Sequence, residues 1–169
     1  MFDRILVALD TLPSNLQVFD TALSLAKLTQ SRLLLAHILL PNSPAHYCLS
    51  PEDPEDQEAR HLEMLRSFHS MAQQANIGAD LAQPLARPGD EICKLAVDWG
   101  ADLIVMGRRG GNETKEPIDG SSQPSSVSNY VVQHASCPVL VLQHQEMEFK
   151  LSSPKIKINQ RFMPLATPD

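Results

Sequence analysis

The feature that most constrains this chain is an alternation of short apolar runs with longer segments of helical periodicity, continuing through residue 143. Short runs rich in leucine, isoleucine and valine are typical of parallel strands buried on both faces. They occupy residues 4–9, 32–40, 80–86, 102–106 and 137–143. Strands that alternate with helices form βαβ units with right-handed crossovers. The sequence therefore predicts a single α/β domain, a five-stranded parallel Rossmann-like sheet with helices on both faces.

The segments between these runs place apolar residues on one helical face. They are residues 18–28, 55–74, 92–99 and 127–134. Ser14 or Asn15 can cap the first helix, because their side chains accept hydrogen bonds from backbone N–H groups. Pro84 interrupts the third apolar run, and proline cannot donate to a strand ladder. That strand is therefore expected at an edge of the sheet.

Two segments do not belong to the alternation. Residues 41–56 form a polar, proline-rich connection, and residues 144–169 combine charge, prolines and one short alternating piece, KIKIN. The domain is therefore expected to span residues 1–143. Residues 144–169 are expected to be a C-terminal tail, partly extended and partly disordered.

Charge and cysteine content narrow the class of partner and the compartment. The formal net charge of -6 argues against nucleic acid, because a duplex binder needs a basic face. No apolar run approaches the roughly 20 residues of a membrane span, and residues 1–10 lack the shape of a signal peptide. Cys48, Cys93 and Cys137 lack metal-type spacing, so we expect small core residues in a reducing cytoplasm.

One stretch has the composition of an anion-binding loop. Residues 106–128 read MGRRGGNETKEPIDGSSQPSSVS and lie between a predicted strand and a predicted helix. Glycines let the backbone approach an anion, and the start of a helix offers free N–H groups and a partial positive charge. The stretch is compatible with phosphate binding and also with a plain surface loop that ends in a serine cap.

Other candidates stand at the carboxyl ends of predicted strands, where α/β sheets bind ligands. Asp10 can accept hydrogen bonds from ribose hydroxyls or an adenine amino group, and it can equally be a cap or turn residue. Arg108 and Arg109 can neutralise phosphate or be solvated surface arginines. His61 and His69 are spaced too unevenly around a helix for a metal pair, and His37 suits a hydrogen-bonded core position.

Several catalytic motifs are absent from the sequence. It has no GK[ST] ending of a P-loop, no G-x-G-x-x-G after the first strand and no G-x-S-x-G nucleophile turn. The acidic residues 53–58 are explained by a solvated helix start. None of these absences identifies a catalytic site, and no Ser-His-Asp set can be assembled from the sequence.

Four segments in this order resemble the universal stress protein family: RILVALD, LLLAHIL, ADLIVMGRRG and SVSNYVVQHASCPVLVLQ. The resemblance covers about residues 1–143. It implies a five-stranded parallel sheet of the adenine nucleotide alpha hydrolase-like kind, often dimeric through the last strand. ATP-binding members carry G-x2-G-x9-G-[S/T] shortly before V-S-N.

The loop matches that pattern in two ways. Gly107, Gly110, Gly120 and Ser121 satisfy the written spacing, but Ser125 and Ser126 occupy the place directly before the V-S-N segment at Val127. We favour the second alignment, because the start of the helix fixes where the free N–H groups lie. The resemblance implies adenine contacts from Ala8 and Ile38, a ribose contact from Asp10, and phosphate contacts from residues 107–110. The full implied set is Ala8, Asp10, Ile38, Met106, Gly107, Arg108, Arg109, Gly110, Gly120, Ser121, Ser125, Ser126 and Val127.

Three functions follow as hypotheses. The first is a dimeric stress-response regulator that binds ATP, with or without Mg²⁺, or a related adenine nucleotide. The second is a nucleotide-free family member that acts as a dimeric protein-interaction module. The third is slow ATP hydrolysis, which is disfavoured because no general base or Mg²⁺-binding carboxylate pair is evident.

Overall fold

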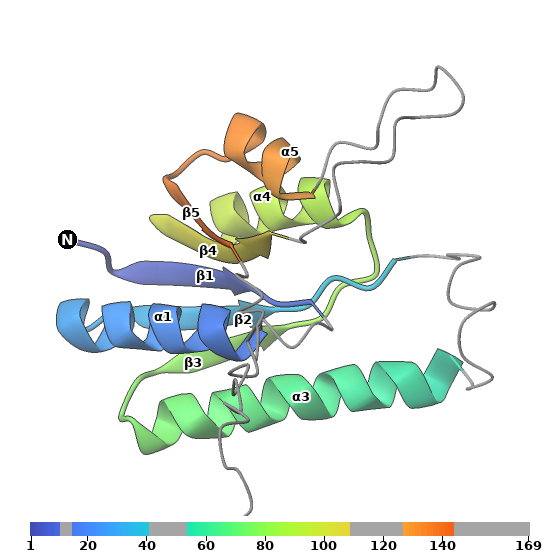
Figure 1. Ribbon diagram of the computed structural model, residues 1–169, viewed down its shortest axis with the longest axis horizontal. Helices are drawn as coiled ribbons and strands as arrows, with labels where there is room; N and C mark the ends of the chain where they lie inside the picture. The colour runs from blue at the N-terminus through green and yellow to red at the C-terminus, as the bar shows by residue number, and fades with distance from the viewer. Residues whose placement is uncertain (11–14, 41–53, 109–126, 144–169) are drawn as a thin grey trace, which may run out of the picture.

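The computed structural model of the protein describes residues 1–10, 15–40, 54–108 and 127–143. Strands and helices alternate along the chain (Figure 1). The elements are β1 (Arg4–Ala8), α1 (Asn15–Thr29), β2 (Arg32–Ala36), α3 (Pro54–Gln74), β3 (Ala79–Ala82), α4 (Pro88–Trp99), β4 (Leu103–Arg108), α5 (Val127–His134) and β5 (Val139–Gln143). The five strands form one sheet in the order β3-β2-β1-β4-β5, and all neighbours are parallel. The predicted fold class is confirmed.

Strand β1 lies at the centre of the sheet, and the direction of the crossovers reverses beside it. From β1 the chain proceeds outward to β2 and β3, then returns to β4 on the other side of β1 and ends at β5. Ala8, the last residue of β1, is the Cα partner of both Ala36 in β2 and Met106 in β4. The gap between the carboxyl ends of β1 and β4 is therefore the topological switch point, where open α/β sheets bind ligands.

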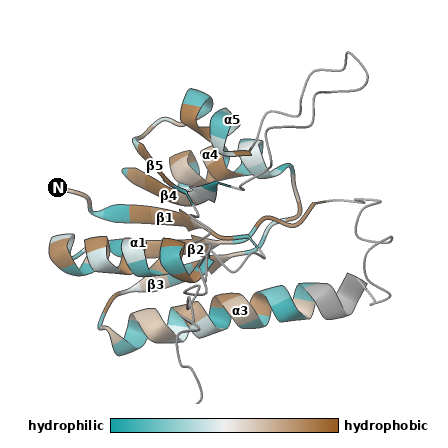
Figure 2. Cartoon of the chain, viewed as in Figure 1, coloured by the Kyte–Doolittle hydropathy of each residue, from teal (hydrophilic) through white to brown (hydrophobic). Residues whose placement is uncertain are grey.

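Alternate residues of the strands build two separate cores. Ile5 and Val7 of β1 pack with Phe19 of α1 and Phe68 of α3, whose rings lie 4.7 Å apart. Leu6 of β1 packs on the opposite face of the sheet, among residues of α4 and α5. Figure 1 shows this arrangement, with α1 and α3 on one face of the sheet and α4 and α5 on the other. In Figure 2 the strands are mostly apolar while the helices mix apolar and polar residues, as expected for helices that cover a buried sheet.

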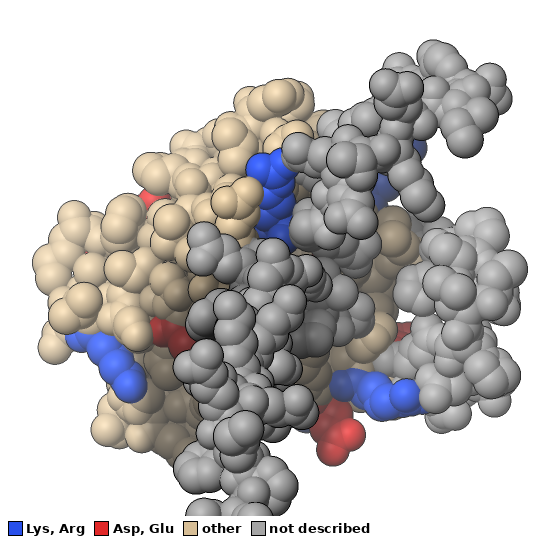
Figure 3. Space-filling view, viewed as in Figure 1, with Lys and Arg blue, Asp and Glu red and all other residues tan. Residues whose placement is uncertain are grey.

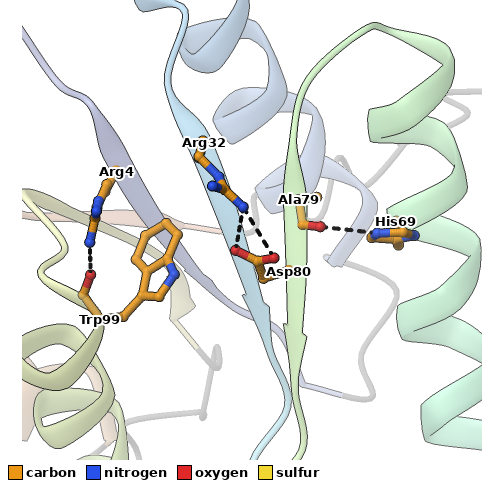
Figure 4. A network of polar contacts seen from close by, with 6 residues as sticks. All are labelled: Arg4, Arg32, His69, Ala79, Asp80 and Trp99. Carbon is orange, nitrogen blue, oxygen red and sulfur yellow. Dashed lines mark hydrogen bonds and ion pairs between the residues drawn. The ribbon is translucent and has the colours of Figure 1, made fainter.

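Side chains at the amino ends of the strands form structural contacts (Figure 4). The Asp102 carboxylate accepts hydrogen bonds from the N–H groups of Asp3, at 2.7 Å, and Arg4. The Arg4 guanidinium donates to the Trp99 carbonyl at 2.6 Å and lies 5.7 Å from the centre of the indole ring. These contacts tie β1, α4 and β4 together at the end of the sheet opposite the switch point.

All five strands have boundaries that differ from the predicted ranges, most of all the second, third and fourth. The third strand ends at Ala82 and not at residue 86, so Pro84 lies beyond it. The second strand ends at Ala36, although the chain stays beside its neighbour through an isolated parallel bridge between Leu39 and Leu85. The fourth strand does not end at Met106. It continues through Gly107 and Arg108, because Leu142 and Gln143 of β5 lie opposite them and offer pairing partners.

The position predicted for the third strand is confirmed. Strand β3 is an edge strand, and Pro84 lies just beyond it, where its carbonyl accepts a hydrogen bond from Leu39 at 2.9 Å. The predictions for residues 41–53 and for the tail, residues 144–169, fall outside the described part of the chain. No helix among the described residues is both long and apolar enough to cross a membrane.

Candidate functional site

The predicted adenine contacts, Ala8 and Ile38, lie with Met106 of the wider predicted set at the carboxyl ends of the central strands. Ala8 and Met106 are Cα partners across β1 and β4, and Ile38 follows two residues after β2. All three pack in the core cluster on the face covered by α4 and α5. Ala8 and Ile38 are half-buried while Met106 is buried. Ala8 and Ile38 are therefore the part-exposed apolar residues beside the switch point, with Met106 in the core beneath them.

The main chain of Asp10 is held by the amide of Asn15, the first residue of α1. The Asp10 N–H donates to Asn15 Oδ1 at 2.9 Å, and Asn15 Nδ2 donates back to the Asp10 carbonyl. Asn15 Nδ2 also lies 3.6 Å from Sδ of Met64 in α3. Asn15 is one of the few buried polar residues of the described chain, with 6% of its surface exposed. The Asn15 amide faces back toward β1. The sequence had suggested that this side chain could instead cap α1.

The residue before Asp10 is held from the other side by β2. The Leu9 N–H donates to the Ala36 carbonyl at 2.8 Å, and His37 Nδ1 lies 3.0 Å from the Leu9 carbonyl oxygen. Because a carbonyl only accepts, His37 Nδ1 carries the hydrogen in this contact. The His37 ring is buried and lies 4.6 Å from the ring of His61 in α3. The prediction that His37 is a hydrogen-bonded core residue is confirmed.

The phosphate side of the predicted site lies at the end of β4 and the start of α5. Gly107 and Arg108 are half-buried residues of β4, paired with Leu142 and Gln143. Val127 begins α5, as predicted, and is 39% exposed. The remaining predicted contacts lie outside the described residues: Arg109, Gly110, Gly120, Ser121, Ser125 and Ser126.

Helix α5 is positioned by one aromatic side chain packed on a glycine of α4. A Cβ atom at Gly89 would lie 2.7 Å from Cδ1 and 3.1 Å from Cγ of Tyr130, so no larger residue fits without movement. Interaction with the Asp90 carboxylate raises the pKa of Tyr130 above its ordinary value, with desolvation adding to the shift. The Tyr130 ring also stacks on His134 at 4.1 Å. The start of α5 is therefore held through Tyr130.

The cysteines and histidines add no metal centre in the described residues. No group of three or more histidine, cysteine or acidic side chains could hold a metal ion there. Cys93 and Cys137 are free and half-buried, and burial raises the pKa of each thiol, with a further contribution from Asp90 and Asp102 respectively. Cys93 and Cys137 pack against the core cluster on the face covered by α4 and α5, as predicted, and Cys48 lies outside the described residues.

The charges on the visible face are dispersed. Figure 3 shows basic and acidic side chains scattered singly over the described residues of this face, without a continuous basic surface. A single anionic group held by helix N–H groups needs no such surface. The arrangement therefore combines an apolar surface, a strand-terminal carboxylate and the start of a helix around one switch point.

The sequence alone missed two contributors to this region. Asn15 was visible only as a possible cap, and its bonds to Asp10 were not foreseen. The packing of Tyr130 on Gly89 could not be predicted from either segment, because the two residues belong to helices that are far apart in the sequence. A glycine at the start of α4 could have raised the question of a close approach.

Comparison with known families gives one consistent result. The model of the family described as "Universal stress protein family" matches residues 1–143. A universal stress protein of Synechocystis sp. is 30% identical over 157 residues, covering 85% of this chain and 99% of the relative. The universal stress protein YxiE of Bacillus subtilis is 30% identical over 152 residues, covering 84% of this chain and 99% of the relative.

Solved structures of this fold include nucleotide complexes. The universal stress protein UspA from Lactobacillus plantarum superimposes with a TM-score of 0.64 at 23% identity, covering 83% of this chain and 97% of that one. A family member from Arabidopsis thaliana with AMP bound gives a TM-score of 0.60 at 21% identity, covering 89% and 97%. Other universal stress proteins of similar fold are complexes with cAMP (TM-score 0.61, 21% identity, 83% and 97% covered) and, from Archaeoglobus fulgidus, with dAMP (0.57, 19%, 82% and 96%).

Proposed function

This chain belongs to the universal stress protein family, and we propose that it is a regulatory protein that binds ATP or a related adenine nucleotide. The observation that carries the proposal is the convergence of Ala8, Ile38 and Met106 at the switch point, directly beside Asp10. Relatives of the same fold bind AMP, cAMP and dAMP, which share the adenine base. The cellular role that we propose is stress-response signalling by the nucleotide-bound state.

The bound nucleotide would use chemically distinct parts of the site. The adenine base would lie on Ala8 and Ile38, with Met106 beneath them, where its burial is favourable. Asp10 would accept a hydrogen bond from a ribose hydroxyl, a charge-assisted bond of the stronger kind. Neither contact requires a bond of the nucleotide to break, so the proposal is binding without a catalytic cycle.

The phosphates would lie between the end of β4 and the start of α5. The N–H groups of the first turn of a helix point out of its N-terminus, and the helix dipole favours an anion there. We assign phosphate contacts to the segment from Gly107 to Gly110 and to Ser125 and Ser126, directly before Val127. Glu113, Glu116 and Asp119 would repel a triphosphate unless a cation intervened, so ATP would bind with Mg²⁺.

We also propose that the protein is a homodimer joined through β5. The two edges of the sheet differ in composition. Strand β3 carries Asp80, which pairs with Arg32 at 3.1 Å (Figure 4), whereas residues 139–142 of β5 are all apolar and half-buried. Charged side chains on an edge strand oppose pairing with a strand of another molecule, and an apolar edge strand favours such pairing. A second copy of β5 would complete the burial of this edge.

The free thiols suggest the compartment. Cys93 and Cys137 are unpaired in the structure. Free cysteines suit a reducing environment, so we place the protein in the cytoplasm.

The decisive experiment is to identify and titrate the nucleotide. Mass spectrometry of the native protein should detect an adenine nucleotide that co-purifies, and calorimetry should show saturable binding of AMP and of ATP with Mg²⁺. Light scattering at micromolar concentration should give the mass of a dimer. A dimer that binds no adenine nucleotide would instead support the interaction-module hypothesis, and a monomeric mass would contradict pairing through β5.

The two alignments of the loop are separable by mutagenesis. Deleting residues 120–124 and substituting Ser125→Gly should tighten ATP binding if Ser125 and Ser126 occupy the phosphate position. Gly120→Val should then have little effect in the full-length loop. If the deletion variant folds but binds no better, while Gly120→Val abolishes binding, Gly120 and Ser121 are the phosphate-binding pair.

A further inference from the structure

We infer that Asn15 is a positioning residue for ribose recognition, acting through the main chain of Asp10. The inference rests on the proposed function, because it assigns to Asn15 the task of orienting the residue proposed to contact the ribose. The structure shows why such a residue is needed. The pairing of β1 with its neighbours ends at Ala8, two residues before Asp10.

The backbone N–H and carbonyl groups of Leu9 and Asp10, the two described residues after β1, each have a partner in a side chain or in β2. Leu9 donates to the Ala36 carbonyl at 2.8 Å, and its own carbonyl faces His37 Nδ1 at 3.0 Å. The N–H and carbonyl of Asp10 both bond to the Asn15 amide. Buried backbone groups without a partner are costly, so these bonds define a single path for the chain as it leaves the sheet.

The chemistry of the Asn15 site selects an asparagine. One group must accept from the Asp10 N–H and another must donate to the Asp10 carbonyl, and a carboxamide offers both at the required spacing. An aspartate in the same place would present an oxygen to the Asp10 carbonyl and could not donate. A serine would carry a single hydroxyl on a shorter side chain.

The position of the Asn15 amide is itself set by packing. Its surface is 94% removed from solvent, as the 6% exposure shows, and Nδ2 also lies 3.6 Å from Met64 Sδ on α3. The amide therefore lies between the end of β1 and α3. Movement of Asn15 would move the peptide of Asp10 and, with it, the carboxylate proposed to accept the ribose hydroxyl.

The test compares AMP with 2′-deoxy-AMP and 3′-deoxy-AMP in calorimetry. Wild type should bind AMP about tenfold more tightly than the analogue that lacks the contacted hydroxyl, equivalent to ~1.4 kcal/mol. Asp10→Ala should lose this preference. Asn15→Ala should lose most of it too, although Asp10 is still present. The double variant should show no further loss of preference, because both changes remove the same interaction.

A measurement without ligand keeps the inference testable if nucleotide binding is absent or too weak. The Asp10 amide should exchange slowly with solvent in wild type and at least tenfold faster in Asn15→Ala, equivalent to ~1.4 kcal/mol of lost protection. Asn15→Asp retains the acceptor and should keep this amide protected while still losing the bond to the Asp10 carbonyl. It is also the variant to use if Asn15→Ala does not fold. Gln17→Ala, an exposed change in the same turn of α1, is the matched control and should alter neither readout.

The outcomes separate this inference from the proposed function. If wild type and Asn15→Ala bind AMP with the same preference for the ribose hydroxyl, or if the Asp10 amide is equally protected in both, the inference is wrong and nucleotide binding stands. If Asn15→Ala binds AMP more weakly but keeps the preference, Asn15 has a structural role alone and the inference is again wrong. If wild type binds no adenine nucleotide, the proposed function fails, and amide exchange alone reports whether Asn15 holds Asp10.

Discussion

The two sides of the candidate site are held in place by different kinds of interaction. On the β1 side, hydrogen bonds from Asn15 and His37 hold the backbone of Leu9 and Asp10. On the α5 side, the start of the helix is positioned by packing of the Tyr130 ring against Gly89. The first side depends on hydrogen-bond partners, and the second depends on the shape of the contact between two helices.

This difference predicts different consequences of mutation. Hydrogen bonds to a backbone are directional, so their loss should affect the position of one residue and the specificity that it provides. A close-packed contact transmits displacement to a whole helix, because protein interiors are nearly incompressible. Changes on the β1 side should therefore alter recognition of the nucleoside, and changes on the α5 side should alter stability and phosphate binding.

The largest effect is expected at Gly89. Gly89→Ala places a Cβ atom against Cγ and Cδ1 of Tyr130, so α5 must move, and unfolding free energy should fall by about 2 to 3 kcal/mol. Chemical denaturation measures this change. Gly78→Ala is the matched control, since its Cβ would meet Arg32 at an ordinary 3.7 Å. AMP affinity should fall more than adenosine affinity, and equal losses for both ligands would contradict an effect through the start of α5.

Removal of the carboxylate at Asp10 is expected to have the next largest effect. Asp10→Ala should weaken binding of AMP by about 2 kcal/mol, the usual cost of losing a hydrogen bond to a charged group. Asp20→Ala, an exposed acidic change on α1, controls for the change in net charge. Calorimetry that finds equal AMP affinity in wild type and Asp10→Ala would remove Asp10 from the site without affecting the fold.

A smaller effect is expected at His37. His37→Phe keeps a ring beside His61 but cannot donate to the Leu9 carbonyl, so stability should fall by about 1.5 kcal/mol. His69→Phe is a matched comparison, because His69 Nε2 contacts the Ala79 carbonyl at 3.0 Å, away from the site. Both variants should lose stability in thermal unfolding, but only His37→Phe should also weaken adenosine binding. A weaker adenosine affinity in both would show that the loss is not specific to the end of β1.

The smallest effect is expected for the Tyr130 hydroxyl, and it should depend on pH. Interaction with Asp90 raises the pKa of Tyr130 in the folded state above its ordinary value of about 10. Stability from this interaction is therefore fully present below pH 10 and is lost as pH rises through the raised pKa. Wild type should be slightly more stable than Tyr130→Phe at pH 7 to 9, and the difference should decline above pH 10 in urea titrations. A constant difference across this range would show that the hydroxyl contributes by packing.

The ends of the elements show where sequence patterns lose information. The apolar run of residues 32–40 continues past the last paired residue of β2, Ala36, because hydrophobicity reports burial and not hydrogen bonding. Gly107 and Arg108 look like loop residues in the sequence, yet they pair with β5. In both cases the end of the strand depends on where the neighbouring strand ends. The sequence of one strand does not contain that information.

What the sequence determined by itself is the set of properties that arise within short segments. Apolar runs and helical periodicity specified the parallel sheet, Pro84 indicated its edge strand, and the strand-terminal position of Asp10 marked the ligand-binding end. The tertiary structure alone decided which groups meet across that end. The amide of Asn15 faces Asp10 because α1 and α3 bury it there, and Tyr130 meets Gly89 because α4 and α5 pack on the same face of the sheet. Such contacts depend on distances between separate elements, which are fixed only when the whole core is packed.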